Sequence, residues 1–239
     1  MNSAHRHLIG ISFALALAGA WTLGAPLPEA HAAYLASDAL GHLDGSDNPV
    51  YAASSTNNGS STPNTRGFSG PYQAAFDTVR HRLFVTDAFN NRVLVFALDT
   101  SDTPVDRVAD NVLGQPNFAS NTAAITQSGL SGAGGIAYDH ANDRLFVADY
   151  SNNRVLVFDT TSITNGENAT NVLGQTSFTG STAATTQSGM STPLYLAYDE
   201  TNSRLFLIDS GNNRVTTYDV AAITNGENAT NVLGQTSFT

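Results

Sequence analysis

Apolar residues in this chain fall into short blocks separated by polar turns, and one such pattern recurs. Three copies read RLFVTDAFNNRVLVF (82–96), RLFVADYSNNRVLVF (144–158) and RLFLIDSGNNRVTTY (204–218). A second phrase, NVLGQ, recurs at 111–115, 171–175 and 231–235. A repeat of fixed period indicates an array of small units that bury their apolar faces against one another.

Each unit contains the pattern of four short strands. A run ending in an aromatic residue and Asp opens it, as in AAFD (74–77), GIAYD (135–139) and YLAYD (195–199). For the first unit we expect strands near 74–77, 82–87, 92–97 and 111–114, with equivalents in the later units. The continuous apolar Leu-Phe-Val and Val-Leu-Val runs predict burial on both sheet faces. The predicted fold is all-β, with repeated four-stranded antiparallel meanders stacked as the blades of a β-propeller.

The repeated phrase also points to a family. The VADxxNNRVxVF pattern, with an aromatic-Asp strand before it and a short strand ending in Gly after it, resembles the NHL repeat over residues 68–236. The resemblance implies blades at about 72–115, 134–175 and 194–235 and a six-bladed ring. The chain departs from the usual repeat in its longer connectors, such as 176–193.

A propeller ring closes with about four to eight blades, and this chain contains three units. The segment 163–179 is repeated without change at 223–239, which indicates recent duplication. We therefore expect 68–239 to be part of a longer propeller whose ring closes with further blades. A homodimer of two three-blade arcs is the alternative.

Several repeated polar positions are interpreted as structural. In each hairpin an Asp ends one strand and an Arg opens the next, so the carboxylate can accept guanidinium or backbone hydrogen bonds, while Asn tolerates positive φ in the turn. Metal binding would need six or more oxygens converging on one point, and one Asp per blade spreads them apart. We expect no metal and no cofactor. The positions are Asp87, Asn91, Arg92, Asp149, Asn153, Arg154, Asp209, Asn213 and Arg214.

The N-terminal residues 1–32 have the features of a secretory signal peptide. A short basic start precedes an apolar stretch, and Ala30-His31-Ala32 supplies the small residues of a cleavage site. A retained membrane anchor is the alternative. Residues 33–67 form a polar segment, in which Ala39-Leu40-Gly41-His42 weakly echoes Val112-Leu113-Gly114-Gln115. We expect an exported protein without membrane insertion after cleavage.

Composition restricts the classes of partner. There is no cysteine, and the formal net charge is −10, with 10 Arg and Lys against 20 Asp and Glu. Six arginines occupy two repeated positions rather than one patch, and a polyanion needs an electropositive surface. Nucleic acid is therefore excluded as an expected partner.

The hairpin tips vary most between the units and should share one face with the long connectors. Variable loops on a repeated scaffold commonly form a binding surface, so Phe89, Tyr150, Ser151 and Ser210 are the candidate binding face. Neutral drift at tolerant positions explains the variation equally well.

The expected function is that of an exported, non-catalytic scaffold that binds a protein, peptide or glycan. Some propellers similar to this family are lyases or lactonases, so an enzyme with catalytic residues on other blades is the alternative. His42, His81 and His140 form no closely spaced ligand set, and no catalytic residue is assigned.

Overall fold

Short strands and tight turns make up the computed structural model, which describes residues 38–239. Blade 1 contains β1 (Pro71–Asp77), β2 (Arg82–Asp87), β3 (Arg92–Ala97) and β4 (Asn111–Leu113). Blade 2 contains β5 (Ala133–Asp139), β6 (Arg144–Asp149), β7 (Arg154–Asp159) and β8 (Asn171–Leu173). Blade 3 contains β9 (Pro193–Asp199), β10 (Arg204–Asp209), β11 (Arg214–Asp219) and β12 (Asn231–Leu233). Single 3-10 turns η1 to η4 lie at Thr56–Gly59, Ala88–Asn90, Tyr150–Asn152 and Ser210–Asn212.

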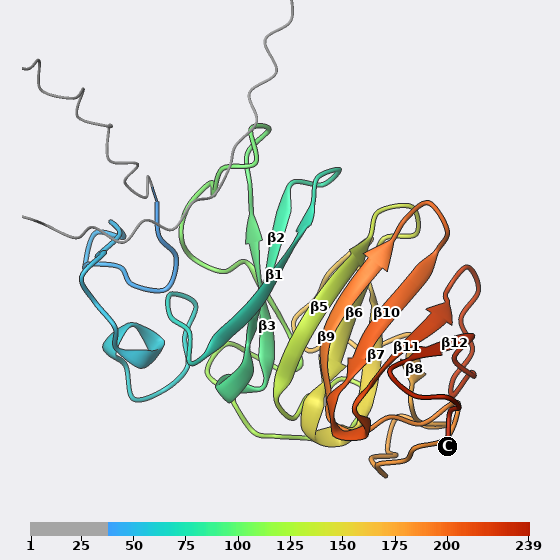
Figure 1. The fold of residues 1–239 in the computed structure, drawn as a ribbon. Helices are drawn as coiled ribbons and strands as arrows, with labels where there is room; N and C mark the ends of the chain where they lie inside the picture. Colours follow the sequence, from blue (N-terminus) through green and yellow to red (C-terminus); the bar gives the residue numbers. More distant parts are fainter. Residues whose placement is uncertain (1–37) are drawn as a thin grey trace, which may run out of the picture. The chain divides into compact units, whose positions relative to one another are not determined.

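Each blade is a separate four-stranded antiparallel sheet whose strands are paired in chain order (Figure 1). The predicted all-β fold, with three such blades, is confirmed. A glycine directly follows the fourth, outer strand of each blade. The φ values of these glycines, Gly114, Gly174 and Gly234, are 85°, 84° and 88°. This backbone region strains residues that carry a Cβ, which explains the glycine in every NVLGQ copy. Closure into a six-bladed ring stays a prediction.

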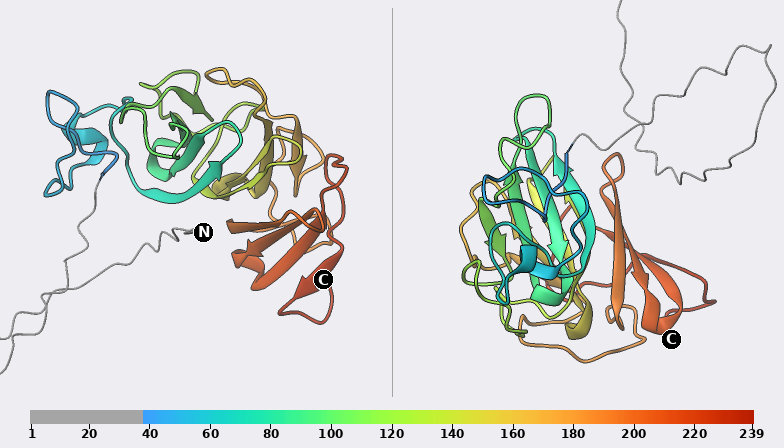
Figure 2. Two further views of the ribbon diagram at one scale, coloured as in Figure 1. Left: turned by 90° about the horizontal axis from the view of Figure 1, so that it is seen from above. Right: turned by 90° about the vertical axis from the view of Figure 1, so that its left-hand side faces the viewer.

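The blades pack face to face, with β5 in contact with both β1 and β9. Figure 2 shows the three sheets one after the other. One apolar cluster joins blade 1 to blade 2, and a second joins blade 2 to blade 3. Burial on both faces is therefore complete only in blade 2. In blade 3, which has a neighbour on one side, Leu233 is 58% exposed, whereas its equivalent Leu173 is fully buried.

The segment before blade 1 has no regular strand but repeats part of the blade geometry. Leu40 and Phe68 pack on the side of blade 1 that faces away from blade 2. Gly41 has a φ of 96°, and a Cβ there would meet Phe68, as one on Gly114 would meet Leu130. The predicted echo of the outer strand thus holds at the glycine, although Leu40–His42 forms no ladder.

The described residues leave part of the sequence interpretation untested. The predicted signal peptide, 1–32, and the first residues of the polar segment, 33–37, lie outside them. Residues Leu40–Thr239 form one compact unit. Within 38–239, no helix has the length and apolar character needed to cross a membrane.

Candidate functional site

A buried ion pair fixes the hairpin tip of each blade. In blade 2, Asp149 accepts hydrogen bonds from the Arg154 Nε at 2.7 Å, from the Asn152 Nδ2 at 2.9 Å and from the Ser131 backbone N–H at 2.7 Å. The side chains of Asp149 and Arg154 are both fully buried. Blades 1 and 3 repeat the pair with Asp87–Arg92 and Asp209–Arg214 at the same distance.

The guanidinium of each pair also ties two connectors to the tip. Arg154 donates to the carbonyl oxygens of Thr126 and Gly129, both at 2.9 Å, and to that of Phe178. The two connectors that flank blade 2 therefore meet at one buried cation. Because its donors are used in this way, Arg154 holds the tip and has no free group for a ligand.

In blades 1 and 2, the second Asn of the turn joins the tip to the following connector. Asn91, Asn153 and Asn213 adopt φ values of 53°, 51° and 52°, the left-handed region that Asn tolerates better than most residues. The Asn91 carboxamide accepts from the Gly132 N–H at 2.7 Å and donates to the Asn121 carbonyl at 2.8 Å. The tip of blade 1 is thereby fixed against the segment that enters blade 2.

These contacts surround a cleft of about 500 Å³ at the tip end of the blades. We call it the tip cleft and define it by Tyr72, Phe89, Tyr150, Ser151, Leu194 and the segment 131–134. Phe89 is 77% exposed and Tyr72 44% exposed, and Tyr150 is also exposed. Aromatic side chains at this density on a surface are typical of a binding site rather than of a folded core.

The first strand of each blade, which we call the inner strand, begins irregularly next to this cleft. In β1, β5 and β9 two residues lie opposite one on the neighbouring strand, at 72–73, 134–135 and 194–195. Such a bulge redirects side chains out of the strand alternation. Tyr72 of blade 1 and Tyr195 of blade 3 consequently stack, with ring centroids 5.1 Å apart and planes at 16°.

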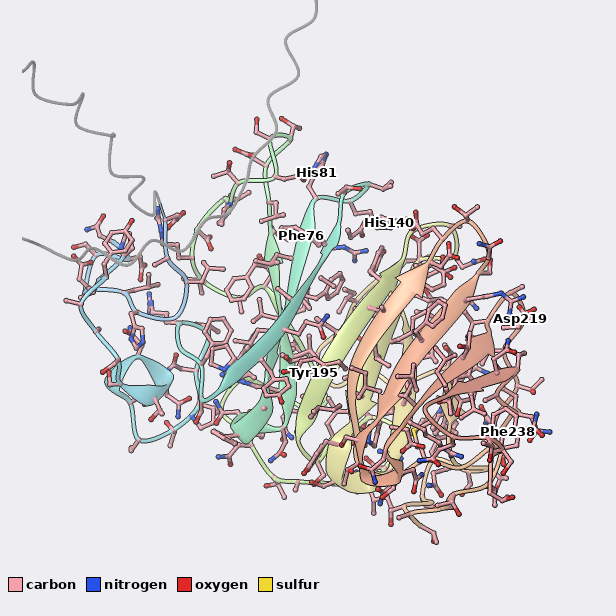
Figure 3. The ribbon with its side chains drawn as sticks, viewed as in Figure 1. Phe76, His81, His140, Tyr195, Asp219 and Phe238 are labelled. Carbon is pink, nitrogen blue, oxygen red and sulfur yellow. The ribbon has the colours of Figure 1, made fainter. Side chains whose placement is uncertain are left out.

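The stack spans blade 2 because the bulge of that blade consists of Gly134 and Gly135. A Cβ on Gly135 would lie 2.6 Å from the Tyr195 Cα, so a larger residue would force the inner strands apart. Figure 3 shows Tyr195 in the middle of the molecule, with His81 and His140 at the far end of the strands. A hydrogen bond to Tyr195 raises the pKa of the Tyr72 hydroxyl, and burial and the nearby Tyr150 add to the shift.

The walls of the cleft carry no net charge. Among residues 38–239, no charged side chain lines it, and the closest Asp–Arg pairs are buried and neutralise each other. At the other repeated arginine position, Arg82 and Arg144 are also paired with aspartates, Asp77 and Asp139. The chemistry offered to a ligand is therefore aromatic and hydroxylic.

The structure brings together some of the predicted face and leaves one member outside. Phe89, Tyr150 and Ser151 line the tip cleft, whereas Ser210 does not. Instead, the Ser210 Oγ donates to the Thr192 carbonyl oxygen at 2.8 Å.

Sequence reasoning missed Tyr72, Tyr195 and Leu194. The available signal was a tyrosine at the start of two inner strands, but the bulges hid which way these side chains point. Within 38–239, no three side chains able to hold a metal lie together.

Comparison with protein-family models gives one match, which lies in and just before blade 2. The NHL repeat model matches residues 130–158, which run from the end of the connector through β5, β6 and most of β7. Blades 1 and 3 repeat the same phrase in register. The chain therefore carries an NHL repeat in blade 2. No curated protein sequence matches it.

Two solved structures show distant similarity to this chain. A chain in the crystal structure of a nidogen/laminin complex is 17% identical with a TM-score of 0.44, over 71% of this chain and 50% of that one. A functionally unknown protein from Desulfotomaculum acetoxidans DSM 771 is 13% identical with a TM-score of 0.41, over 62% of this chain and 37% of that one. This chain thus spans half or less of the length of these two structures.

Proposed function

We propose that this NHL-repeat protein is an exported, non-catalytic scaffold that binds a partner through the tip cleft. The observation that carries the proposal is the convergence of Tyr72, Phe89 and Tyr150, from two blades, around one uncharged hollow. Exposed aromatic rings lose water on binding at a small entropic cost, because each has only two side-chain torsions. They are therefore effective anchors for a protein, peptide or glycan.

The rigidity of the surroundings supports the same proposal. Phe89 donates its backbone N–H to the Ser69 carbonyl at 3.0 Å, and Tyr150 donates to that of Gly132 at 3.1 Å. The buried Asp–Arg pairs hold both tips from beneath. A cleft that is already formed loses little free energy to ordering when a ligand binds.

Binding is tested by probing peptide and glycan arrays with the cleaved protein, wild type and a Phe89→Ala/Tyr150→Ala double variant. We expect at least one class of probe to bind the wild type and to lose most of its signal with the double variant. Tyr51→Ala is the matched control, since Tyr51 is an exposed aromatic residue outside the cleft. Silence across both arrays, or hits that the double variant retains in full, would contradict the proposal.

Export is tested separately, by expressing the full chain in a secreting host and sequencing the N-terminus of the released protein. The small residues of Ala30-His31-Ala32 predict a mature N-terminus at Ala33. A protein that stays cell-associated with residues 1–32 intact would argue for the retained anchor instead.

A further inference from the structure

Three residues that line the tip cleft, two serines and a tyrosine, carry hydroxyl groups without a protein partner. In the described part of the chain, the side-chain hydroxyls of Ser131, Ser151 and Tyr150 make no hydrogen bond. Each is able to donate one. Asn91 also lines the cleft, but its side-chain amide is already engaged at both its oxygen and its nitrogen. The cleft therefore offers free hydroxyl groups, which can donate and accept hydrogen bonds, and no charged acceptor.

This inventory favours one chemistry of ligand over others. A charged peptide would find no counter-ion, because no charged residue lines the cleft in the described residues. A glycan presents many hydroxyl donors, which are best received by carboxylates and free amides, and the walls offer only hydroxyl oxygens in that role. A ligand with carbonyl acceptors and few N–H groups is the better match.

A proline-rich segment has that composition. Proline has no N–H, and its extended helix leaves every backbone carbonyl oxygen free of internal hydrogen bonds. Its rings pack on aromatic-lined grooves, and its backbone is ordered before it binds. Phe89, Tyr72 and Tyr150 would supply the ring contacts, and the free hydroxyls would donate to the carbonyl oxygens.

We propose, resting on the proposed function above, that the partner of the tip cleft is an uncharged proline-rich segment in the polyproline II conformation. Phe89 is its main anchor, because it has the largest exposed fraction of the aromatic residues in the cleft. Tyr150 serves as both a ring contact and a hydroxyl donor.

The test is calorimetric titration of the cleaved protein with an acetylated, amidated oligoproline. A Gly-Ser peptide of the same length and a neutral cello-oligosaccharide are the comparison ligands. We expect oligoproline alone to bind. Its binding to Phe89→Ala should be about tenfold weaker, which corresponds to about 1.4 kcal/mol, because truncating a central aromatic anchor is costly. Tyr51→Ala should bind it as the wild type does. Tyr150→Phe keeps the ring and removes the hydroxyl, so a smaller loss with this variant would assign the donor role.

The outcomes separate the two proposals. Binding of the cello-oligosaccharide but not of oligoproline, lost in Phe89→Ala, would overturn the proline-rich ligand and leave the cleft as the binding site. Oligoproline binding that Phe89→Ala does not weaken would place the ligand elsewhere and overturn this inference. No binding of any ligand here or on the arrays would overturn both. The melting temperatures of the variants are measured as a control. We expect them to be unchanged, so that each binding result reports on the cleft rather than on folding.

Discussion

Replacing Asp149 by Ala should destabilise the whole molecule through the cation that it leaves behind. Arg154 would stay fully buried without its counter-ion, and breaking a buried ion pair by removing one partner costs about 3–5 kcal/mol. The guanidinium keeps its bonds to three carbonyl oxygens, which partly replace the lost charge. We therefore expect the lower end, about 3 kcal/mol, including the unpaired Ser131 N–H and Asn152 amide.

Urea denaturation followed by circular dichroism measures this loss, and blade 2 is the right place because its neighbours bury it on both sides. Asp149→Asn removes the charge but keeps one acceptor oxygen, so it should cost less than Asp149→Ala. The matched control is Asp159→Ala, because Asp159 is exposed at the end of β7 and its loss should cost about 0.5 kcal/mol or less. A loss below about 1 kcal/mol for Asp149→Ala, or a stoichiometric metal site that disappears with it, would refute the structural role.

Three further predictions use positions where the structure offers a comparison. Leu173→Ala should cost about 2–5 kcal/mol, whereas Leu233→Ala, at the exposed equivalent site, should cost less than about 1 kcal/mol; equal losses in urea titrations would show that another surface covers blade 3. Burial raises the pKa of Tyr218 to about 12. The contribution of this residue to the free energy of unfolding is therefore full below pH 10 and is lost as the pH rises toward 12. Tyr218→Phe, which introduces the residue that blade 2 has at this position (Phe158), should remove this alkaline loss in melting curves. Burial alone would raise the pKa of Asp77, but hydrogen bonds from the Arg80 N–H, the Arg82 guanidinium and the Tyr138 hydroxyl lower it below 3.8. The contribution of Asp77 to the free energy of unfolding is present above pH 3.8 and is lost as the pH falls through the lower folded-state pKa. Asp77→Asn should therefore reduce the fall in stability at acid pH, and an unchanged fall would contradict this.

Features that depend on local backbone geometry could be predicted from the sequence. The strands at 82–87 and 92–97 agree with β2 and β3 to the residue. Asn91 adopts the left-handed conformation that its turn requires. Asp87 pairs with Arg92 because they face each other across one hairpin. Each of these features follows from a few neighbouring residues, so the three copies of the repeated phrase were enough to predict it.

Features that depend on contacts between blades could not be predicted. The stack of Tyr72 on Tyr195 joins the first and third blades, and it exists only because Gly134 and Gly135 carry no side chains between them. The bulges also break the alternation from which side-chain direction is inferred. For the same reason Phe89 and Tyr150 could be named from their variability, but their partner Tyr72 could not.

The central claim, that the tip cleft is the binding surface, is tested most directly by mapping a bound ligand. The measurement is the change in backbone and aromatic chemical shifts of the labelled protein on titration with any probe that the arrays identify. We expect the largest changes at 88–91, 131–134 and 150–151, at the tip end of the blades. Changes confined to the turns at the other end of the strands, 78–81, 140–143 and 200–203, would contradict the claim.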